Sequence, residues 1–133
     1  MSERATGAAD GAVQGLLRLE GLALLGCAAG LYWRAGGDWK QFAILFLAPD
    51  LSFAGYLAGP RVGAAAYNGA HSTLLPLALG AFGLAFSLPA ACALALIWLA
   101  HVGFDRALGY GLKYGRGFGF THLGRIGRAR KED

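Results

Sequence analysis

Residues 46–76 read FLAPDLSFAGYLAGPRVGAAAYNGAHSTLLP and contain two apolar runs that meet at Gly59, Pro60 and Arg61. Much of this stretch is glycine and alanine, small residues that let helices approach closely in a bilayer but build a poor core in water. Polar side chains, among them Asp50 and His71, stand inside the apolar runs. We therefore predict two consecutive membrane-spanning helices with functional polar groups inside them.

The rest of the chain has the same apolar character. Its 133 residues are 56% hydrophobic and 15% charged, with a mean hydropathy of +0.45, which is too apolar for an ordinary soluble domain. Four apolar segments are long enough to cross a bilayer, at residues 16–35, 39–59, 62–86 and 88–104. We predict one membrane domain over residues 1–133, an all-α four-helix transmembrane bundle followed by a basic, glycine-rich and aromatic tail at 105–133.

The distribution of Lys and Arg predicts the orientation of this bundle, because cytoplasmic flanks of membrane spans carry the excess of basic residues. Two basic residues, Arg34 and Lys40, lie on one side of the predicted membrane. The other ten lie on the opposite side: Arg4, Arg18, Arg61, Arg106, Lys113, Arg116, Arg125, Arg128, Arg130 and Lys131. The sequence thus predicts a multi-pass protein of the inner, cytoplasmic membrane with both termini in the cytoplasm.

Each predicted span carries polar groups, which are costly in a bilayer and therefore usually face the interior of a bundle. Asp50 follows Pro49 near the middle of the second span, and the fourth span ends with His101 and Asp105 four residues apart on one helical face. The remaining groups are Glu20 in the first span and Asn68 and His71, three residues apart, in the third. We predict that they line one polar cavity that opens to the cytoplasm, with Arg106 and Lys113 at its rim.

Imidazole and carboxylate are ligands of divalent zinc, manganese and iron. We therefore interpret Asp50, His71, His101 and Asp105 as metal ligands, with Glu20 as a further ligand or a catalytic general base for hydrolysis of a lipid-like or small anionic substrate.

Two alternatives remain open at this stage. Asp50 and His71 could carry protons or ions, in a pathway or in a small subunit of a transport assembly, without any enzymatic activity. The polar groups could instead only fix helix register in a structural or interaction protein.

The composition of the tail at 105–133 predicts contact with lipid. Its glycines alternate with aromatic and basic residues, as is typical of a segment that anchors on anionic lipid. A sharper reading makes it a lid that brings Lys113, Arg116 or His122 to an anionic substrate. Because the basic residues concentrate in this tail, we expect no nucleic-acid partner. Gly26 and Gly30, spaced as GxxxG, permit a homo-oligomer.

Four strings carry a resemblance to a known family: RLEG at 18–21, FLAPDLSFAGYLAGPRVGAAAYNGAH at 46–71, WLAHVGFDRALGYGLKY at 98–114 and THLGR at 121–125. They resemble a family of small bacterial membrane proteins catalogued as a domain of unknown function, numbered four-two-six-zero. The resemblance implies a bacterial four-helix membrane protein. Its polar positions match here at Glu20, Asp50, Asn68, His71, His101, Asp105, Arg106 and Lys113. The order of motifs is also distantly similar to membrane-bound metal-dependent hydrolases, although their extended histidine motifs are missing.

Overall fold

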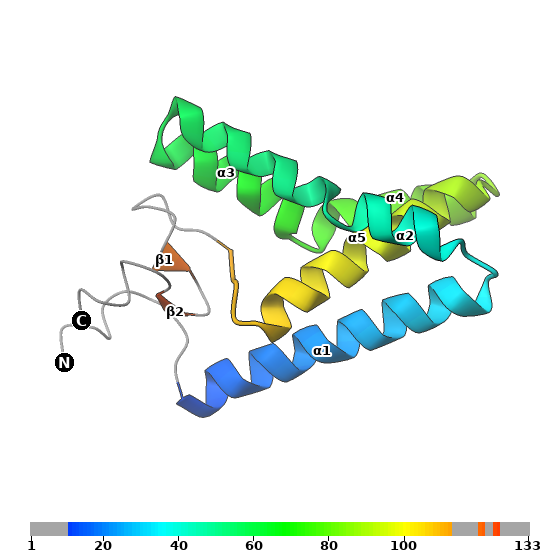
Figure 1. Cartoon of the computed structure of the whole chain (residues 1–133), viewed down its shortest axis with the longest axis horizontal. Helices are drawn as coiled ribbons and strands as arrows, with labels where there is room; N and C mark the ends of the chain where they lie inside the picture. Colours follow the sequence, from blue (N-terminus) through cyan, green and yellow to red (C-terminus); the bar gives the residue numbers. More distant parts are fainter. Residues whose placement is uncertain (1–10, 113–119, 122–123, 126–133) are drawn as a thin grey trace.

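The structure is a computed structural model that describes residues 11–112, 120–121 and 124–125. Its helices are α1 Gly11–Arg34, α2 Trp39–Phe46, the 3₁₀ helix η2 Ala48–Ala58, α3 Pro60–His71, α4 Leu74–Ala85 and α5 Pro89–Ala107. Two short strands, β1 Phe120–Thr121 and β2 Gly124–Arg125, form an antiparallel pair in the tail (Figure 1). The described part of the chain is thus predominantly helical, as predicted.

Within the described residues, three helical stretches are long and apolar enough to cross a membrane: Gly11–Arg34, Trp39–Ala58 (α2 followed by η2) and Pro89–Ala107. They correspond to the first, second and fourth predicted segments. Many of their large side chains are exposed, among them Leu22, Ile44 and Leu57. A lipid environment accounts for such exposure, since apolar side chains on the outside of a bundle are solvated by acyl chains.

Helices α1 and α5 form the closest helix pair, and glycines make that approach possible. A Cβ atom built on Gly21 would lie 2.6 Å from Cβ of Arg106, and one built on Gly103 would lie 2.6 Å from the carbonyl oxygen of Gly21. The backbones therefore touch directly, as small residues allow in membrane helices. Arg18 adds a hydrogen bond from Nε to the carbonyl oxygen of Ala107 at 3.0 Å. The first residues of α1 and the last of α5 consequently lie at the same end of the molecule.

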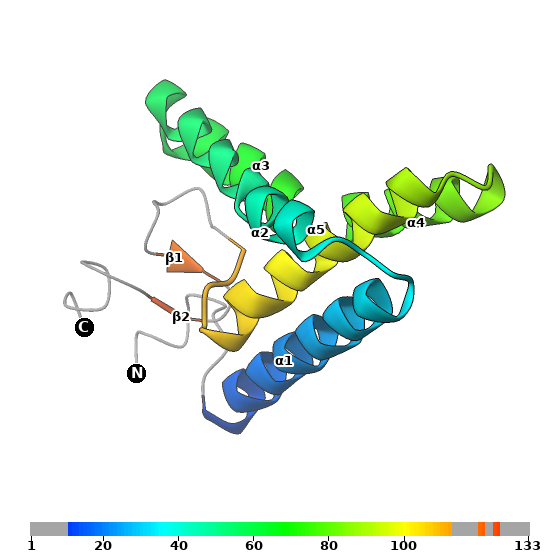
Figure 2. The same ribbon diagram turned by 45° about the vertical axis from the view of Figure 1, so that its right-hand side comes forward.

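The second predicted segment consists of two helices rather than one. Pro49 has no N–H and crowds the turn before it, so α2 ends at Phe46 and the chain continues as η2. At 11 residues, η2 is much longer than most 3₁₀ helices. It packs against α3 through Gly63, where an added Cβ would meet the ring of Tyr56. Figure 2 shows that this η2–α3 hairpin diverges from α1 and α5.

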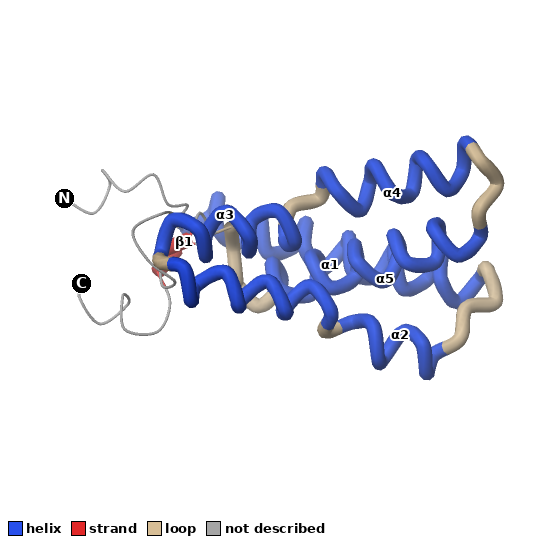
Figure 3. Tube along the Cα trace, turned by 90° about the horizontal axis from the view of Figure 1, so that it is seen from above, coloured by secondary structure: helices blue, strands red, loops and turns tan. Residues whose placement is uncertain are grey.

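The third predicted segment, 62–86, is divided into α3 and α4. Ser72 closes α3 through a hydrogen bond from its N–H to the carbonyl oxygen of Asn68 at 2.8 Å, and its own backbone is extended. In a continuous helix the ring of Pro76 would collide with the carbonyl group of Ser72, four residues earlier. The chain therefore turns, and α4 packs along α5 at the other end of the molecule (Figure 3).

Helices α4 and α5 form the expected antiparallel hairpin. Its turn holds Ser87 at a positive φ of 54°, and α5 begins at Pro89. Gly83 lies so close to Cys92 that an added Cβ would fall 2.8 Å from the sulfur atom. On the outer face of α1, by contrast, Gly26 and Gly30 have open space where a Cβ would be. Association of copies through that open face stays a prediction.

Candidate metal centre

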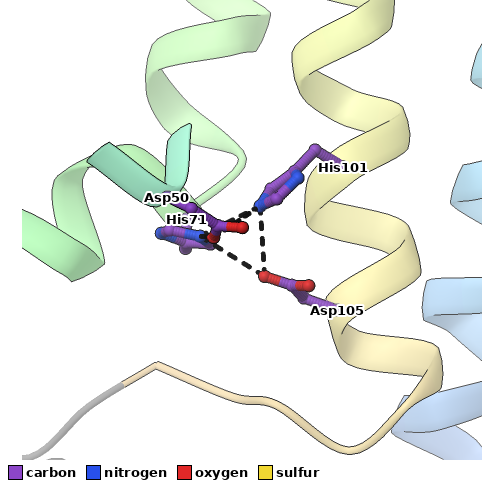
Figure 4. Close-up of side chains that lie close together, drawn as sticks. All are labelled: Asp50, His71, His101 and Asp105. Carbon is purple, nitrogen blue, oxygen red and sulfur yellow. Dashed lines mark hydrogen bonds and ion pairs between the residues drawn. The ribbon is translucent and has the colours of Figure 1, made fainter. Parts of the chain in front are cut away.

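Four of the predicted site residues meet where the η2–α3 hairpin touches α5 (Figure 4). Asp50 lies in the first turn of η2, directly after Pro49, and His71 is the last residue of α3. His101 and Asp105 come from α5, where the spacing of four residues places both on the side that faces the hairpin. The base of the hairpin and the last turns of α5 thus supply two donors each.

The donor atoms lie within van der Waals reach of one another. Nε2 of His71 is 3.1 Å from Nε2 of His101, 3.1 Å from Oδ1 of Asp50 and 3.3 Å from Oδ2 of Asp105. Nε2 of His101 is 3.2 Å from each of the same two carboxylate oxygens. One donor atom from each of the four residues can be chosen so that all lie within 4.8 Å of one another.

These separations match the edges of a metal coordination shell. Four donors arranged as a tetrahedron at about 2.0 to 2.1 Å from an ion are separated from each other by about 3.3 Å. The five separations given above lie between 3.1 and 3.3 Å. Two imidazoles and two carboxylates suit zinc, and manganese and iron(II) accept the same donor types.

The hydrogen bond on the far side of the His71 ring orients the ring for coordination. Its Nδ1 lies 2.9 Å from the carbonyl oxygen of Tyr67. A carbonyl oxygen only accepts, so Nδ1 must carry a proton and donate it. In the neutral ring, Nε2 then presents its lone pair to the cluster, which is the arrangement that metal-binding histidines commonly have. Nδ1 of His101 is buried, and the described residues offer it no hydrogen-bond partner.

Aromatic rings hold both imidazoles in place. The ring of Tyr67 stacks on that of His71, with centroids 3.7 Å apart and planes inclined by 7°. The ring of Phe46 meets that of His101 edge to face at 5.1 Å, and Phe104 packs in turn on Phe46. Ring contacts of this kind restrict the rotamers of the two histidines and preorganise their nitrogen atoms.

The cluster concentrates acceptors in a poorly solvated place. The side chains of His71 and His101 are 3% and 1% exposed, whereas those of Asp105 and Asp50 are 15% and 35% exposed. Two unpaired carboxylates in this poorly solvated cluster would cost free energy, and one divalent cation would balance their charge. Because Asp50 is the most exposed donor, its side of the cluster is the open one.

Other predicted residues lie outside this group of donors. Gly103 is two residues from His101 and from Asp105, so α1 packs against the face of α5 opposite to the donors. Glu20 is exposed on α1 and is not one of the grouped donors. Asn68 is half-buried one turn before His71, and its side chain is not one of the donors.

The predicted rim of the cavity is described only in part. The Arg106 guanidinium group reaches the carbonyl oxygen of His71 over 3.5 Å, so it lies beside the cluster as predicted. Lys113, Arg116 and His122, proposed as parts of a lid, lie outside the described residues.

One residue that supports the site was missed in the sequence. Nε1 of Trp98 donates a hydrogen bond to the carbonyl oxygen of Ala70, the residue before His71. It therefore ties the end of α3 to α5 beside the donors. Its position one turn before His101 was the available signal, because residues three apart share a helical face.

Neither the curated proteins nor the solved structures include one that matches the chain. A family model does match, over residues 14–126, and this range includes all four donors. The match confirms the resemblance carried by the motifs at 18–21, 46–71, 98–114 and 121–125. The chain therefore belongs to the family described as a domain of unknown function, DUF4260.

Proposed function

We propose that this protein binds one divalent metal ion through Asp50, His71, His101 and Asp105 and uses it for hydrolysis within a membrane. The observation that carries the proposal is the convergence of four donors from three helices, with five separations of 3.1 to 3.3 Å. Helix register alone would not require this arrangement. Charge balance supports the same reading, since two carboxylates match one divalent cation.

A bound divalent ion would supply Lewis-acid chemistry, which polarises a carbonyl or phosphoryl oxygen and activates water. Hydrolysis adds the hydroxyl group of that water to one side of the broken bond and its hydrogen atom to the other. The chain contributes the four donors and the aromatic support of both imidazoles. Arg106, beside His71, is positioned to meet negative charge on the substrate. We assign Glu20 no role at the metal, because α1 packs on the face of α5 opposite to the donors.

We place the metal in a four-pass membrane protein with cytoplasmic termini. The three long apolar helices provide three crossings, and α3 with α4 would make the fourth. The common end of α1 and α5 and the distribution of basic residues support this orientation.

Cysteine labelling tests the topology, using a variant in which Cys27 and Cys92 are replaced by serine. A cysteine at Ala35 or at Ser87 should react with an impermeant maleimide added to intact cells. One at Arg61 should react only after the membrane is permeabilised. Reaction of all three in intact cells would refute the orientation.

Elemental analysis of detergent-purified protein tests the metal. We expect about one zinc, manganese or iron ion per chain, and its loss in His71→Ala and His101→Ala. Asp50→Asn keeps the shape of the side chain but removes its charge, so metal affinity should fall about 10- to 100-fold. Asp38→Asn, a change of the same chemistry at the N-cap of α2, is the matched control and should keep the metal. Full metal content in both histidine variants would reject the site.

A second function is favoured by the contacts between neighbouring donors. Each imidazole lies within 3.3 Å of both carboxylates, so the cluster could also pass protons between Asp50 and Asp105. Liposomes that contain the metal-free protein would then acidify under a proton gradient, and Asp50→Asn would abolish the flux. Absence of flux in the wild type would exclude this function.

A further inference from the structure

An apolar cavity lies next to the candidate metal centre. Its volume is about 370 Å³, within the range of ligand-binding pockets. Four helices and η2 surround or adjoin it, and its walls include Leu45, Pro49, Ser52, Ala70, Leu79 and Trp98. Carbon atoms form almost all of this surface, so the cavity suits a hydrocarbon group and not a small anion.

The cavity and the metal centre share the same backbone segments. Pro49 precedes Asp50, Ala70 precedes His71, and Trp98 precedes His101 by one helical turn. Along α5, Leu94 lies seven residues before His101, about 10 Å at a rise of about 1.5 Å per residue. The donors themselves do not line the cavity, so an apolar chain attached to a group at the donors would enter it by passing Pro49, Ala70 and Trp98.

Polar atoms in the cavity wall are few. The indole N–H of Trp98 is already used, since it donates to the carbonyl oxygen of Ala70. The hydroxyl group of Ser52 is buried and has no partner among the described residues. A buried water molecule needs two or more hydrogen-bond partners, and this wall offers few beyond the Ser52 hydroxyl group. The cavity therefore favours an alkyl chain over water.

We propose that the substrate of the metal centre is an amphiphile with a single alkyl or acyl chain, which occupies this cavity while its polar group meets the metal. This inference rests on the proposed metal-dependent function and selects the lipid-like substrate class over the small anionic one. The chain would lie between η2, α4 and α5, along the part of α5 from Trp98 to Leu94. Its length would determine affinity, because each methylene group buried adds a similar increment of binding free energy.

Alkyl hydroxamates of increasing length test the cavity, since their head group chelates metal ions. Cobalt-loaded protein in detergent is titrated with acetohydroxamate, butanohydroxamate, hexanohydroxamate and octanohydroxamate, and binding is read from the visible cobalt spectrum. We expect the affinity to rise about fourfold per methylene group until the cavity is filled. Leu79→Trp fills the cavity from α4, and Leu94→Trp fills it from α5. Both should bind acetohydroxamate as the wild type does, with no gain from longer chains.

Leu75→Trp is the matched control, because it adds the same indole to an exposed position of α4 outside the cavity. It should keep the wild-type dependence on chain length and thereby correct for partition into the detergent. An equal dependence in all four proteins would overturn the inference while leaving the metal centre intact. A wild-type protein that binds neither cobalt nor acetohydroxamate would overturn the proposed function itself.

Discussion

Replacement of Gly103 by alanine should destabilise the contact between α1 and α5. The added Cβ atom would lie 2.6 Å from the carbonyl oxygen of Gly21 and 2.6 Å from the backbone nitrogen of Leu25. Ordinary contacts are about 3.5 Å long, so the two backbones must separate by about 1 Å. Overpacking costs about 1 to 3 kcal/mol, and these backbone atoms cannot rotate away. We therefore take the upper part of this range, about 2 to 3 kcal/mol, and subtract about 1 kcal/mol for the better helix propensity of alanine, which leaves a net loss of about 1 to 2 kcal/mol.

Titration of the detergent-solubilised protein with dodecyl sulfate, followed by circular dichroism, measures this loss. Gly26→Ala is the matched control, since nothing lies within 4 Å of the position of its Cβ. Its unfolding free energy should rise by about 0.5 to 1 kcal/mol, because alanine has the better helix propensity and nothing opposes its Cβ atom. A shift of α5 would also displace His101 and Asp105, so Gly103→Ala should bind zinc about tenfold more weakly. Equal unfolding midpoints for the two alanine variants would refute the close contact.

Three further substitutions test other contacts. Tyr32→Phe removes hydrogen bonds to the carbonyl oxygen of Asp38 at 2.6 Å and to Oε1 of Gln41 at 3.2 Å; we expect a loss of about 1 to 2 kcal/mol in the same unfolding titration. Trp98→Phe frees the carbonyl group of Ala70 and loosens the end of α3, so calorimetric titration with zinc should show weaker binding by about fivefold. Arg18→Gln removes an exposed hydrogen bond and should change the unfolding free energy by less than about 0.5 kcal/mol; a larger loss would contradict this account.

The grouping of the donors was predictable because helical spacing and depth are readable from a sequence. Four residues separate His101 from Asp105, which fixes them on one face of α5 whatever the neighbouring helices do. Asp50 lies beside a proline in an apolar run, where an unpaired carboxylate is costly in free energy, so a polar partner for it could also be predicted. The side of α5 on which α1 packs depends on the glycine at 103, and a prediction from depth alone therefore placed Glu20 with the donors.

The division of the second and third segments was harder to predict. Pro49 and Pro76 both stand in apolar runs where a membrane helix often tolerates proline. Whether the chain kinks or ends there depends on which neighbour satisfies the freed carbonyl groups. Pro49 is followed by a 3₁₀ helix, whereas Pro76 lies in the first turn of α4, after the bend at Ser72 and Thr73. Each proline disfavours a continuous α-helix, but the form that the break takes, a 3₁₀ helix or a bend into a new α-helix, depends on tertiary packing.

The splayed η2–α3 hairpin would give a bound metal ion a mechanical role. The hairpin packs largely on itself, and the described contacts that join its base to α5 include the donor cluster, the Trp98 indole and the Arg106 guanidinium group. An ion held by two donors from the hairpin and two from α5 would crosslink these two parts of the molecule. At a free metal concentration 100 times the dissociation constant, binding would stabilise the crosslinked form by about 2.7 kcal/mol relative to the form that does not bind the ion. Loading and unloading of the ion would thus set the angle of the hairpin as well as the chemistry beside it.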